Sequence, residues 1–303
     1  MIETSLVDRF GRKTTGLRIA LTSRCNLRCL YCHHEGESSS SNEIQSEMVL
    51  AVAKAASEIG IRNIKFTGGE PLLRIDLVDI ISQMPQNLAL SMTTNGMLLT
   101  QKASELAEAG LERVNISLQS LNPEIYQAIT GSRVGDLQRV LNGIDAALDA
   151  GLRPIKLNMV VLQRNEREIP DLIELARSKG LILQLIELLD LKGLGISGNI
   201  ERAEQILQAN ADRIITREMH RRRKYFLNGA EVEVVRPIDN TEFCANCTRM
   251  RLTSDGKIKP CLLRNDNLIA IKTSNIDEIK KLFRIANERR QPFFKQGGRS
   301  LEN

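Results

Sequence analysis

The sequence predicts an α/β fold, a partial (βα)6 barrel of the TIM type with a small, mostly antiparallel α+β extension at its C-terminal end. In the first 190 residues, short apolar runs alternate with amphipathic runs of helical period. This alternation is typical of parallel strands that are buried on both faces and covered by helices. Six such units occur, fewer than the eight of a closed barrel, so we expect an open barrel.

Six strands and five helices account for the alternating part. The apolar runs predict strands at Leu17–Leu21, Asn63–Phe66, Leu88–Thr93, Arg113–Leu118, Ile155–Leu162 and Leu181–Leu188. The amphipathic runs predict helices at Ser46–Ile59, Leu77–Met84, Gln101–Ala109, Gly135–Ala150 and Ile169–Ser178. Four of these helices are followed by a glycine, the usual residue at a helix end: Gly60, Gly110, Gly151 and Gly180.

After residue 190 the pattern changes, and we expect two domains, residues 1–190 and 191–303. A glycine-rich link at residues 192–195 leads to a helix near Ile200–Gln208. Two Asx-Gly pairs then predict hairpins, Asn228-Gly229 between Lys224–Leu227 and Val232–Val235, and Asp255-Gly256 between Arg249–Thr253 and Lys257–Cys261.

The composition indicates a folded protein with a sizeable core. Hydrophobic residues make up 42% and charged residues 26% of 303 positions. No apolar run approaches the roughly 18 residues that a membrane span needs, and the start of the chain has no signal-peptide core. We therefore expect a cytoplasmic protein. In that reducing compartment, six cysteines favour metal binding or catalysis over disulfides.

Positive charge is concentrated in the second part of the chain. Residues 1–190 hold 20 basic and 23 acidic side chains, whereas residues 191–303 hold 22 basic and 14 acidic ones. The resulting net charges of −3 and +8 suggest an anionic partner for the second part. Ten aromatic residues are too few for a base-stacking platform, which argues against nucleic acid. We interpret much of the basic run from Arg221 to Lys224 as a solvated helix face.

Cys25, Cys29 and Cys32 form a C-x3-C-x2-C pattern in the loop after the first predicted strand. Three soft thiolates in one tight loop suit either zinc or an iron–sulfur cluster. His33 or His34 would complete a Cys3His zinc set. A [4Fe–4S] cluster ordinarily takes four cysteines, so three would leave one iron open to a small-molecule ligand. The spacing alone leaves both interpretations open.

Cys244, Cys247 and Cys261 form a second incomplete set, with the spacing C-x2-C-x13-C. A zinc ribbon needs a fourth ligand at similar spacing. No Cys or His follows Cys261, and the nearest His upstream is His220. A second cluster with an open iron therefore fits this triad better than zinc does.

The first triad, with Tyr31 before its last cysteine, resembles the cluster motif of radical S-adenosylmethionine (SAM) enzymes. Thr67-Gly68-Gly69-Glu70-Pro71, after an apolar strand, resembles the GGE motif of that superfamily, and the two motifs together make zinc a poor interpretation. The second triad, with Thr248 to Gly256 inside it, is similar to the molybdenum-cofactor biosynthesis protein A family, the GTP 3′,8-cyclases. Stretches at residues 93–96, 114–118 and 156–160 support this resemblance.

The resemblance implies a lyase that performs the first step of molybdenum cofactor (molybdopterin) biosynthesis. It implies two [4Fe–4S] clusters and SAM as cofactors and GTP as substrate. In that family a 5′-deoxyadenosyl radical removes hydrogen from C3′ of GTP, and the C3′ radical adds to guanine C8. The guanine contacts the open iron of the second cluster. An electron donor such as flavodoxin or ferredoxin and a downstream cyclic pyranopterin synthase are the implied partners, with no membrane and no nucleic acid.

The family's functional positions can be carried over motif by motif. The resemblance places one cluster on Cys25, Cys29 and Cys32 and the other on Cys244, Cys247 and Cys261. It places four residues near SAM, namely Tyr31 (through its main chain), Gly69, Ser117 and Leu189. It places six residues near GTP, namely Arg18, Lys65, Thr93, Lys156, Arg249 and Arg251. Several cations suit a triphosphate, and no side chain is expected to be a catalyst, since cluster and SAM carry the chemistry.

Some positions depart from the family pattern. Lys65 stands where Arg is common, Asn63 where Lys occurs, Leu189 in place of Met, Gln184 in place of Arg, and Gln119 in place of Asp. The family commonly ends in a Gly-Gly that enters the active site, whereas Gly297-Gly298 is followed here by Arg299–Asn303.

Two alternatives make different predictions. A radical SAM maturase with an auxiliary cluster, acting on a peptide or a tetrapyrrole, predicts a longer, cysteine-rich C-terminal part. A zinc-stabilised nucleic-acid-binding module predicts zinc in place of iron, and more exposed aromatic residues.

Overall fold

The computed structural model describes residues 6–37, 42–238 and 240–291. The strands are β1 (Gly16–Ala20), β2 (Asn63–Thr67), β3 (Ala89–Thr94), β4 (Arg113–Ser117), β5 (Lys156–Val161), β6 (Ile182–Glu187), β7 (Arg213–Thr216), β8 (Arg223–Leu227), β9 (Ala230–Val235), β10 (Arg249–Leu252), β11 (Lys257–Lys259) and β12 (Ile269–Ala270). The α-helices are α1 (Ser46–Glu58), α2 (Leu77–Ser82), α3 (Leu99–Glu108), α4 (Pro123–Thr130), α5 (Asp136–Asp149), α6 (Ile169–Ser178), α7 (Ile200–Asn210), α8 (Thr241–Ala245) and α9 (Ile276–Glu288). Short 3-10 helices are η1 (His34–Gly36), η2 (Pro71–Leu73), η3 (Glu166–Glu168) and η4 (Met219–Arg221).

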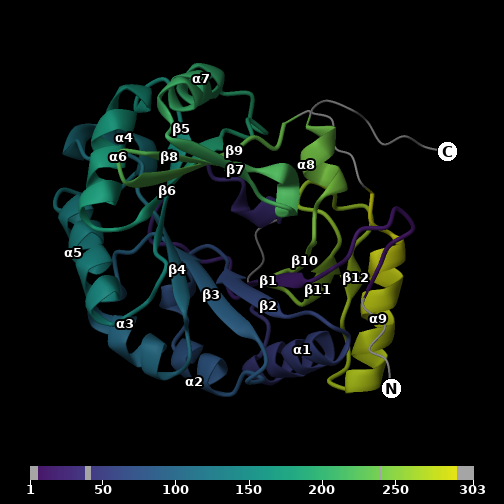
Figure 1. The fold of residues 1–303 in the computed structure, drawn as a ribbon. Coiled ribbons are helices and arrows are strands. Elements are labelled where there is room, and N and C mark those ends of the chain that lie inside the picture. The colour runs from purple at the N-terminus through teal and green to yellow at the C-terminus, as the bar shows by residue number, and fades with distance from the viewer. Residues whose placement is uncertain (1–5, 38–41, 239, 292–303) are drawn as a thin grey trace.

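In the described part of the chain, twelve strands form one sheet in the order β12-β11-β10-β1-β2-β3-β4-β5-β6-β9-β8-β7. Strands β1 to β6 pair in parallel and in sequence order, as the six predicted βα units require. The two ends of the sheet do not pair with each other, so the barrel stays open, with helices on its outer side (Figure 1). The predicted partial barrel is confirmed.

The strands of the C-terminal part continue this sheet at both of its ends. Strand β10 pairs in parallel with β1, and β9 pairs in parallel with β6. The remaining pairs, β7–β8, β8–β9, β10–β11 and β11–β12, are antiparallel, as expected for the extension. Asn228 and Gly229 both have positive φ, 47° and 81°, which confirms the first hairpin turn. The division into domains at residue 190 stays a prediction.

One expectation about local structure was wrong in part, and one helix was not predicted. The run from Arg221 to Lys224 is not a helix face, because it passes from η4 into β8, and Arg222 within it is buried, whereas Arg221 and Arg223 are exposed as expected. Helix α4 was not predicted, although Asn122 caps its first turn by accepting hydrogen bonds from the backbone N–H groups of Glu124 and Ile125. The sequence Asn-Pro at that point is a recognisable helix start.

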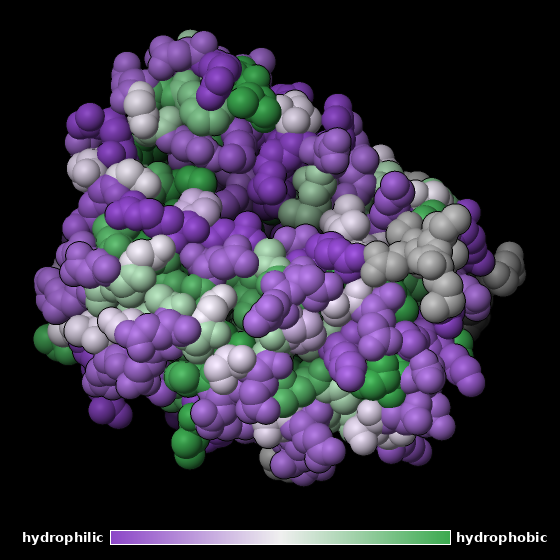
Figure 2. Space-filling model, turned by 60° about the horizontal axis from the view of Figure 1, so that its bottom comes forward, coloured by the Kyte–Doolittle hydropathy of each residue, from purple (hydrophilic) through white to green (hydrophobic). Residues whose placement is uncertain are grey.

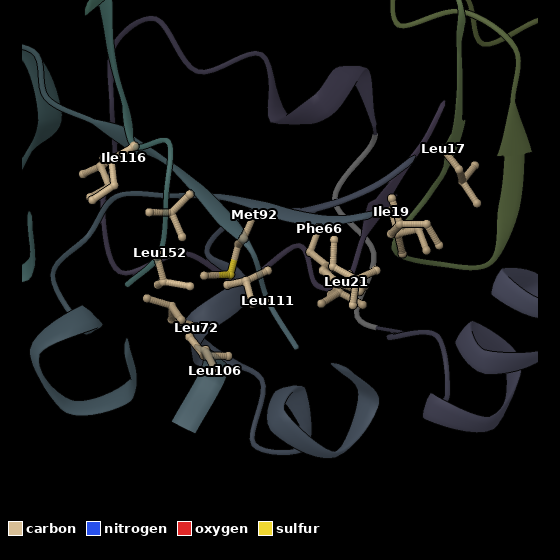
Figure 3. Close-up of a cluster of buried hydrophobic side chains, with 14 of the residues drawn as sticks. Leu17, Ile19, Leu21, Phe66, Leu72, Met92, Leu106, Leu111, Ile116 and Leu152 are labelled. Atoms are coloured by element: carbon tan, nitrogen blue, oxygen red, sulfur yellow. The ribbon is translucent and has the colours of Figure 1, made fainter. Parts of the chain in front are cut away.

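The sequences suggested barrel strands that are apolar on both faces, but in the structure only one face of these strands is apolar. In β1, Leu17 and Ile19 are buried in the core, whereas Arg18 between them faces the inside of the barrel. The outward residues pack against the helices, and Figure 3 shows part of this cluster, with Phe66 and Met92 beneath the sheet. The same alternation of polar inward and apolar outward positions recurs along β2, β4 and β5. The inside of the barrel therefore presents polar and charged side chains and is not a second core.

None of the helices in the described ranges is both long and apolar enough to cross a membrane. On the face shown in Figure 2, hydrophilic residues predominate and hydrophobic ones are scattered among them.

Candidate active site

A cavity of about 990 Å³ lies inside the barrel. Both cysteine triads line it, together with every residue that the sequence assigned to SAM or to GTP: Arg18, Cys25, Cys29, Tyr31, Cys32, Lys65, Gly69, Thr93, Ser117, Lys156, Leu189, Cys244, Cys247, Arg249, Arg251 and Cys261. The structure thus brings all sixteen together from both parts of the chain. The volume of the cavity is near the upper end of the range of roughly 300–1,000 Å³ for small-molecule sites.

The first cysteine loop is held in place by two neighbouring segments. The backbone N–H groups of Arg28 and Leu30 donate to the carbonyls of Thr130 and Ile129, at the end of α4. On the other side, Gly69 donates its N–H to the Thr22 carbonyl at 2.7 Å. These contacts fix the loop at the carboxyl ends of the strands, where sites occur in such folds.

The paired glycines are required by close packing against this loop. A Cβ atom on Gly69 would lie 2.1 Å from the Arg24 carbonyl oxygen, and one on Gly68 would lie 2.4 Å from the Thr22 oxygen. Gly68 also has a φ of +143°, which side chains disfavour. Glu70 ties the turn to β3, because its carboxylate accepts from Thr94 Oγ1 at 2.6 Å and from the Asn95 N–H at 2.7 Å.

The second triad is placed by α8 and by the hairpin of β10 and β11. Cys244 lies in α8, Cys247 follows in the next turn, and Cys261 comes just after β11. The two cysteine loops approach each other, since a Cβ on Gly36 would lie 2.2 Å from the Leu262 carbonyl oxygen. Lys259 strengthens this contact by donating to the Gly36 carbonyl at 2.6 Å.

The donor chemistry fits iron–sulfur clusters at both triads. None of the six cysteines, all of which lie in the described part of the chain, forms a disulfide. Burial raises the pKa of Cys29 to about 12, so this thiol needs a metal to become a thiolate. His34 Nδ1 lies 3.7 Å from Cys32 Sγ. Among the described residues, however, no three His, Cys, Asp or Glu side chains converge on a single-ion site.

The register of the sheet arranges the residues assigned to GTP in rows. Arg251, Arg18 and Lys65 lie side by side across β10, β1 and β2. Arg249 lies two residues before Arg251 on the same face, as predicted. Across β3, β4 and β5 a second row holds Thr93, Asn115 and Lys156, and Lys65 Nζ donates to Asn115 Oδ1 at 2.8 Å.

These cations are crowded and desolvated. Burial lowers the pKa of Lys65 well below its usual range, and the charges of Arg18 and Arg249 lower it further. The pKa of Arg249 is lowered by burial and then by the positive charges of Arg18, Arg222 and Arg251. Burial lowers the pKa of Lys156 to about 8, against the attraction of Glu233. Such a concentration of buried positive charge favours an anionic ligand.

Two carboxylates in the cavity region were missed by the sequence analysis. Glu35 accepts from Arg18 Nη1 at 3.3 Å and from Thr67 Oγ1 at 2.9 Å, and it also pairs with Arg251. Burial alone would raise the pKa of Glu35, but the neighbouring arginines hold it well below its usual range. The fully buried Glu233 pairs with Lys156 and with two arginines of the 217–222 segment. Its position between two valines of β9 was a usable signal, because a charge inside an apolar strand needs a partner.

All five of the positions that depart from the family pattern line the cavity, namely Asn63, Lys65, Gln119, Gln184 and Leu189. Gln119 joins β4 to β5, since its Oε1 accepts from the Val160 N–H at 2.8 Å and its Nε2 donates to the Asn158 carbonyl at 3.3 Å. Gly297-Gly298 lies outside the described residues.

Two protein-family models match the chain, the Radical SAM superfamily over residues 19–176 and Molybdenum Cofactor Synthesis C over residues 181–295. A probable GTP 3′,8-cyclase of Methanocella arvoryzae is 48% identical over 292 residues, which cover 96% of this chain and 95% of that protein. Those of Methanocaldococcus jannaschii and Archaeoglobus fulgidus are 45% and 47% identical, over 95% and 96% of this chain and 99% of each relative. The chain belongs to the GTP 3′,8-cyclase family of the radical SAM superfamily.

The GTP 3′,8-cyclase family acts at the first step of molybdenum cofactor biosynthesis, and its cofactors are SAM and two [4Fe–4S] clusters. Solved structures with low sequence identity share the fold. SuiB of Streptococcus suis bound to SAM has a TM-score of 0.67 at 17% identity, over 94% of this chain and 76% of that chain. Native anSMEcpe with bound AdoMet has a TM-score of 0.58 at 18% identity, over 90% of this chain and 80% of that chain.

Proposed function

We propose that this protein is a GTP 3′,8-cyclase whose cavity holds SAM and GTP between two iron–sulfur clusters. The observation that carries the proposal is the shared cavity, because two cysteine triads from distant parts of the sequence line it together with the rows of buried cations. Six cysteines without a disulfide supply three thiolates to each cluster and leave one iron of each open.

The triphosphate of GTP is bound by the row of Arg251, Arg18 and Lys65, with Arg249 on the same face. Guanidinium groups bind phosphate oxygens in pairs, and the low dielectric of a buried site strengthens each contact. Glu35 occupies two of these arginines in the structure. The incoming triphosphate therefore replaces this carboxylate as their anionic partner.

The ribose and the base of GTP lie beyond the triphosphate, where side chains of β3, β4 and β5 orient them. Thr93, Asn115 and Lys156 present hydroxyl, amide and ammonium groups along one row. Gly69, Ser117, Leu189 and the main chain of Tyr31 bound the SAM side of the cavity. The bound cofactors supply radical chemistry at C3′ of the ribose, and the barrel wall limits the access of water to it.

We also propose the partners and the compartment that this chemistry requires. A low-potential redox protein such as flavodoxin or ferredoxin supplies the electron, and a cyclic pyranopterin synthase consumes the product. We place the protein in the cytoplasm, where reducing conditions keep cysteines from forming disulfides and leave them available for metal binding.

Anaerobic incubation of the reconstituted protein with SAM, dithionite and GTP tests the proposal. We expect 5′-deoxyadenosine and a cyclised GTP product, and neither with ATP in place of GTP. Formation of 5′-deoxyadenosine that does not depend on GTP would favour a maturase acting on a peptide or a tetrapyrrole. Iron analysis should give about eight irons per chain, and zinc alone would contradict the proposal.

A further inference from the structure

The turn before β1 contains a buried ion pair close to the second cysteine triad. Asp8 is buried, and its Oδ2 accepts from Arg12 Nε at 2.7 Å while its Oδ1 accepts from the Arg12 N–H at 3.0 Å. Arg12 then reaches Cys244, donating from Nη1 to the carbonyl oxygen at 3.0 Å. The guanidinium groups of Arg12 and of the exposed Arg9 both lie over the ring of Phe10, 5.8 Å and 4.9 Å from its centroid.

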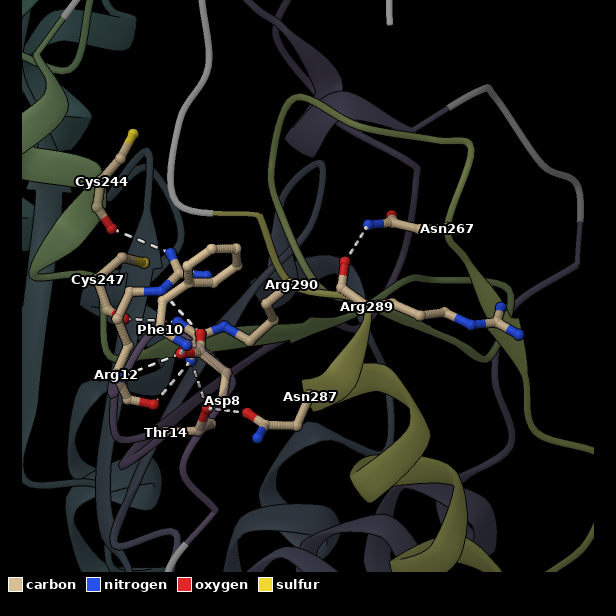
Figure 4. A network of polar contacts seen from close by, with 10 residues as sticks. All are labelled: Asp8, Phe10, Arg12, Thr14, Cys244, Cys247, Asn267, Asn287, Arg289 and Arg290. Carbon is tan, nitrogen blue, oxygen red and sulfur yellow. Dashed lines mark hydrogen bonds and ion pairs between the residues drawn. The ribbon is translucent and has the colours of Figure 1, made fainter. Parts of the chain in front are cut away.

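A second arginine reaches the same place from the other end of the sequence. Arg290, just after α9, is 1% exposed and donates from Nη2 to the Cys247 carbonyl oxygen at 2.5 Å. Its Nη1 lies 3.3 Å from Asp8 Oδ2 and donates to Thr14 Oγ1 at 2.9 Å. Figure 4 shows Arg12 and Arg290 directed at the two cysteines, whereas the neighbouring Arg289 points away.

The charges of this group do not cancel. Two guanidinium groups share the carboxylate of Asp8, so one positive charge is left over beside the cysteine turn. Among the described residues, Arg12 Nη2 and Arg290 Nε are buried without a hydrogen-bond partner, and Arg12 lines the cavity. A whole buried ion pair can often be replaced by apolar residues without loss of stability, although removing one partner alone is costly. The two hydrogen bonds to the Cys244 and Cys247 carbonyls therefore point to a role beyond stability.

We propose that Asp8, Arg12 and Arg290 are positioning residues of the second cluster, fixing the turn from Cys244 to Cys247 and raising the reduction potential of the cluster held there. The hydrogen bonds to both carbonyls set the orientation of the two thiolates. The surplus positive charge stabilises the reduced, more negative state of the cluster, since nearby charge and hydrogen bonds tune such potentials. This inference rests on the second cluster of the proposed function.

The test compares Arg290→Gln with Arg289→Gln, which removes the same charge one residue away on the surface. Both changes are made in the full chain with Cys25, Cys29 and Cys32 replaced by Ser, so that the second cluster alone is reconstituted. We expect Arg290→Gln to lower the reduced-to-oxidised ratio of this cluster at a fixed potential at least tenfold, or 59 mV for one electron. Arg289→Gln should match the parent protein.

Potentiometric titration followed by electron paramagnetic resonance measures this ratio without GTP turnover, so a failure of the proposed cyclase activity would not affect it. Equal potentials in the two variants would overturn the proposal. If Arg290→Gln does not fold, Arg290→Lys is measured in its place. Lysine keeps the positive charge, but its single nitrogen cannot replace both Nη1 and Nη2 of Arg290 as donors. We then expect an altered resonance spectrum with a potential near that of the parent, and an unchanged spectrum would overturn the proposal.

Discussion

Replacing Glu233 by Gln should destabilise the protein by about 3 kcal/mol at neutral pH. Glu233 is fully buried, and its carboxylate pairs with Lys156, with Arg222 Nη1 at 2.9 Å and with Arg217 Nη1 at 3.2 Å. Burial alone would raise the pKa of Glu233, but the three cations outweigh it and lower the pKa from 4.5 to about 2. At about 1.4 kcal/mol for each pKa unit, this difference corresponds to roughly 3 kcal/mol.

The sign of the pH dependence follows from the lowered pKa. Because the folded state binds the proton of Glu233 less readily than the unfolded state, the stabilisation is complete above about pH 4.5 and is lost as the pH falls toward 2. At roughly 2 °C or more for each kcal/mol in a chain of this length, the Glu233→Gln variant should unfold at least about 6 °C below the wild type at pH 7. The difference should shrink at pH 3.

Thermal unfolding followed by circular dichroism measures this effect in the anaerobically prepared protein. Glu231→Gln is the matched control, because Glu231 lies on the same strand and pairs with Lys224 in a more exposed position. Exposed pairs contribute about 0–1 kcal/mol, so the control should unfold within about 3 °C of the wild type. Equal unfolding temperatures for the two variants would mean that Glu233 contributes no more stability than the more exposed Glu231 does.

Three further predictions concern ligand binding. Gly69→Ala should weaken SAM binding at least tenfold, measured by equilibrium dialysis, because the new Cβ meets the Arg24 carbonyl oxygen at 2.1 Å. Gly16→Ala, where the nearest atom is at 3.8 Å, should bind SAM normally, and equal losses would count against the packing argument. Arg249→Gln should raise the Kd for GTP on the order of 10- to 100-fold, from about 1.5–3 kcal/mol for a charged hydrogen bond; an unchanged Kd would remove Arg249 from the site. GTP affinity should fall as the pH rises through about 8, where the buried Lys156 loses its proton, and Lys156→Arg should abolish this dependence, because arginine stays charged.

Local features of the fold could be predicted from the sequence. The helix-ending glycines all have positive φ, and both hairpins occur where Asx-Gly pairs indicated them. The pairing of β10 with β1 and of β9 with β6 could not be predicted, because edges of a sheet meet through contacts between distant parts of the chain. Such pairings leave no local pattern.

The residues of the candidate site could be assigned from motifs, but their partners could not. Arg18 and Lys65 were identified by resemblance, and the structure adds that Arg18 pairs with Glu35 and Lys65 with Asn115. Glu35 follows the first triad by three residues and carries no motif of its own. The function of Glu35 depends on which residues the folded loop places beside it, and local sequence does not determine these contacts.

The position of β10 also limits the order in which the molecule can be built. Strand β1 leaves the ribosome among the first elements, and the strand that covers its free edge is one of the last. Until then the open edge can pair with other chains, as unprotected strand edges do. The carbonyl of Cys247 receives its arginine partner only when Arg290 has emerged. We therefore expect the second cluster to be inserted only after β10 and Arg290 have been synthesised, and slow translation between β1 and Arg290 to lower the yield of active protein.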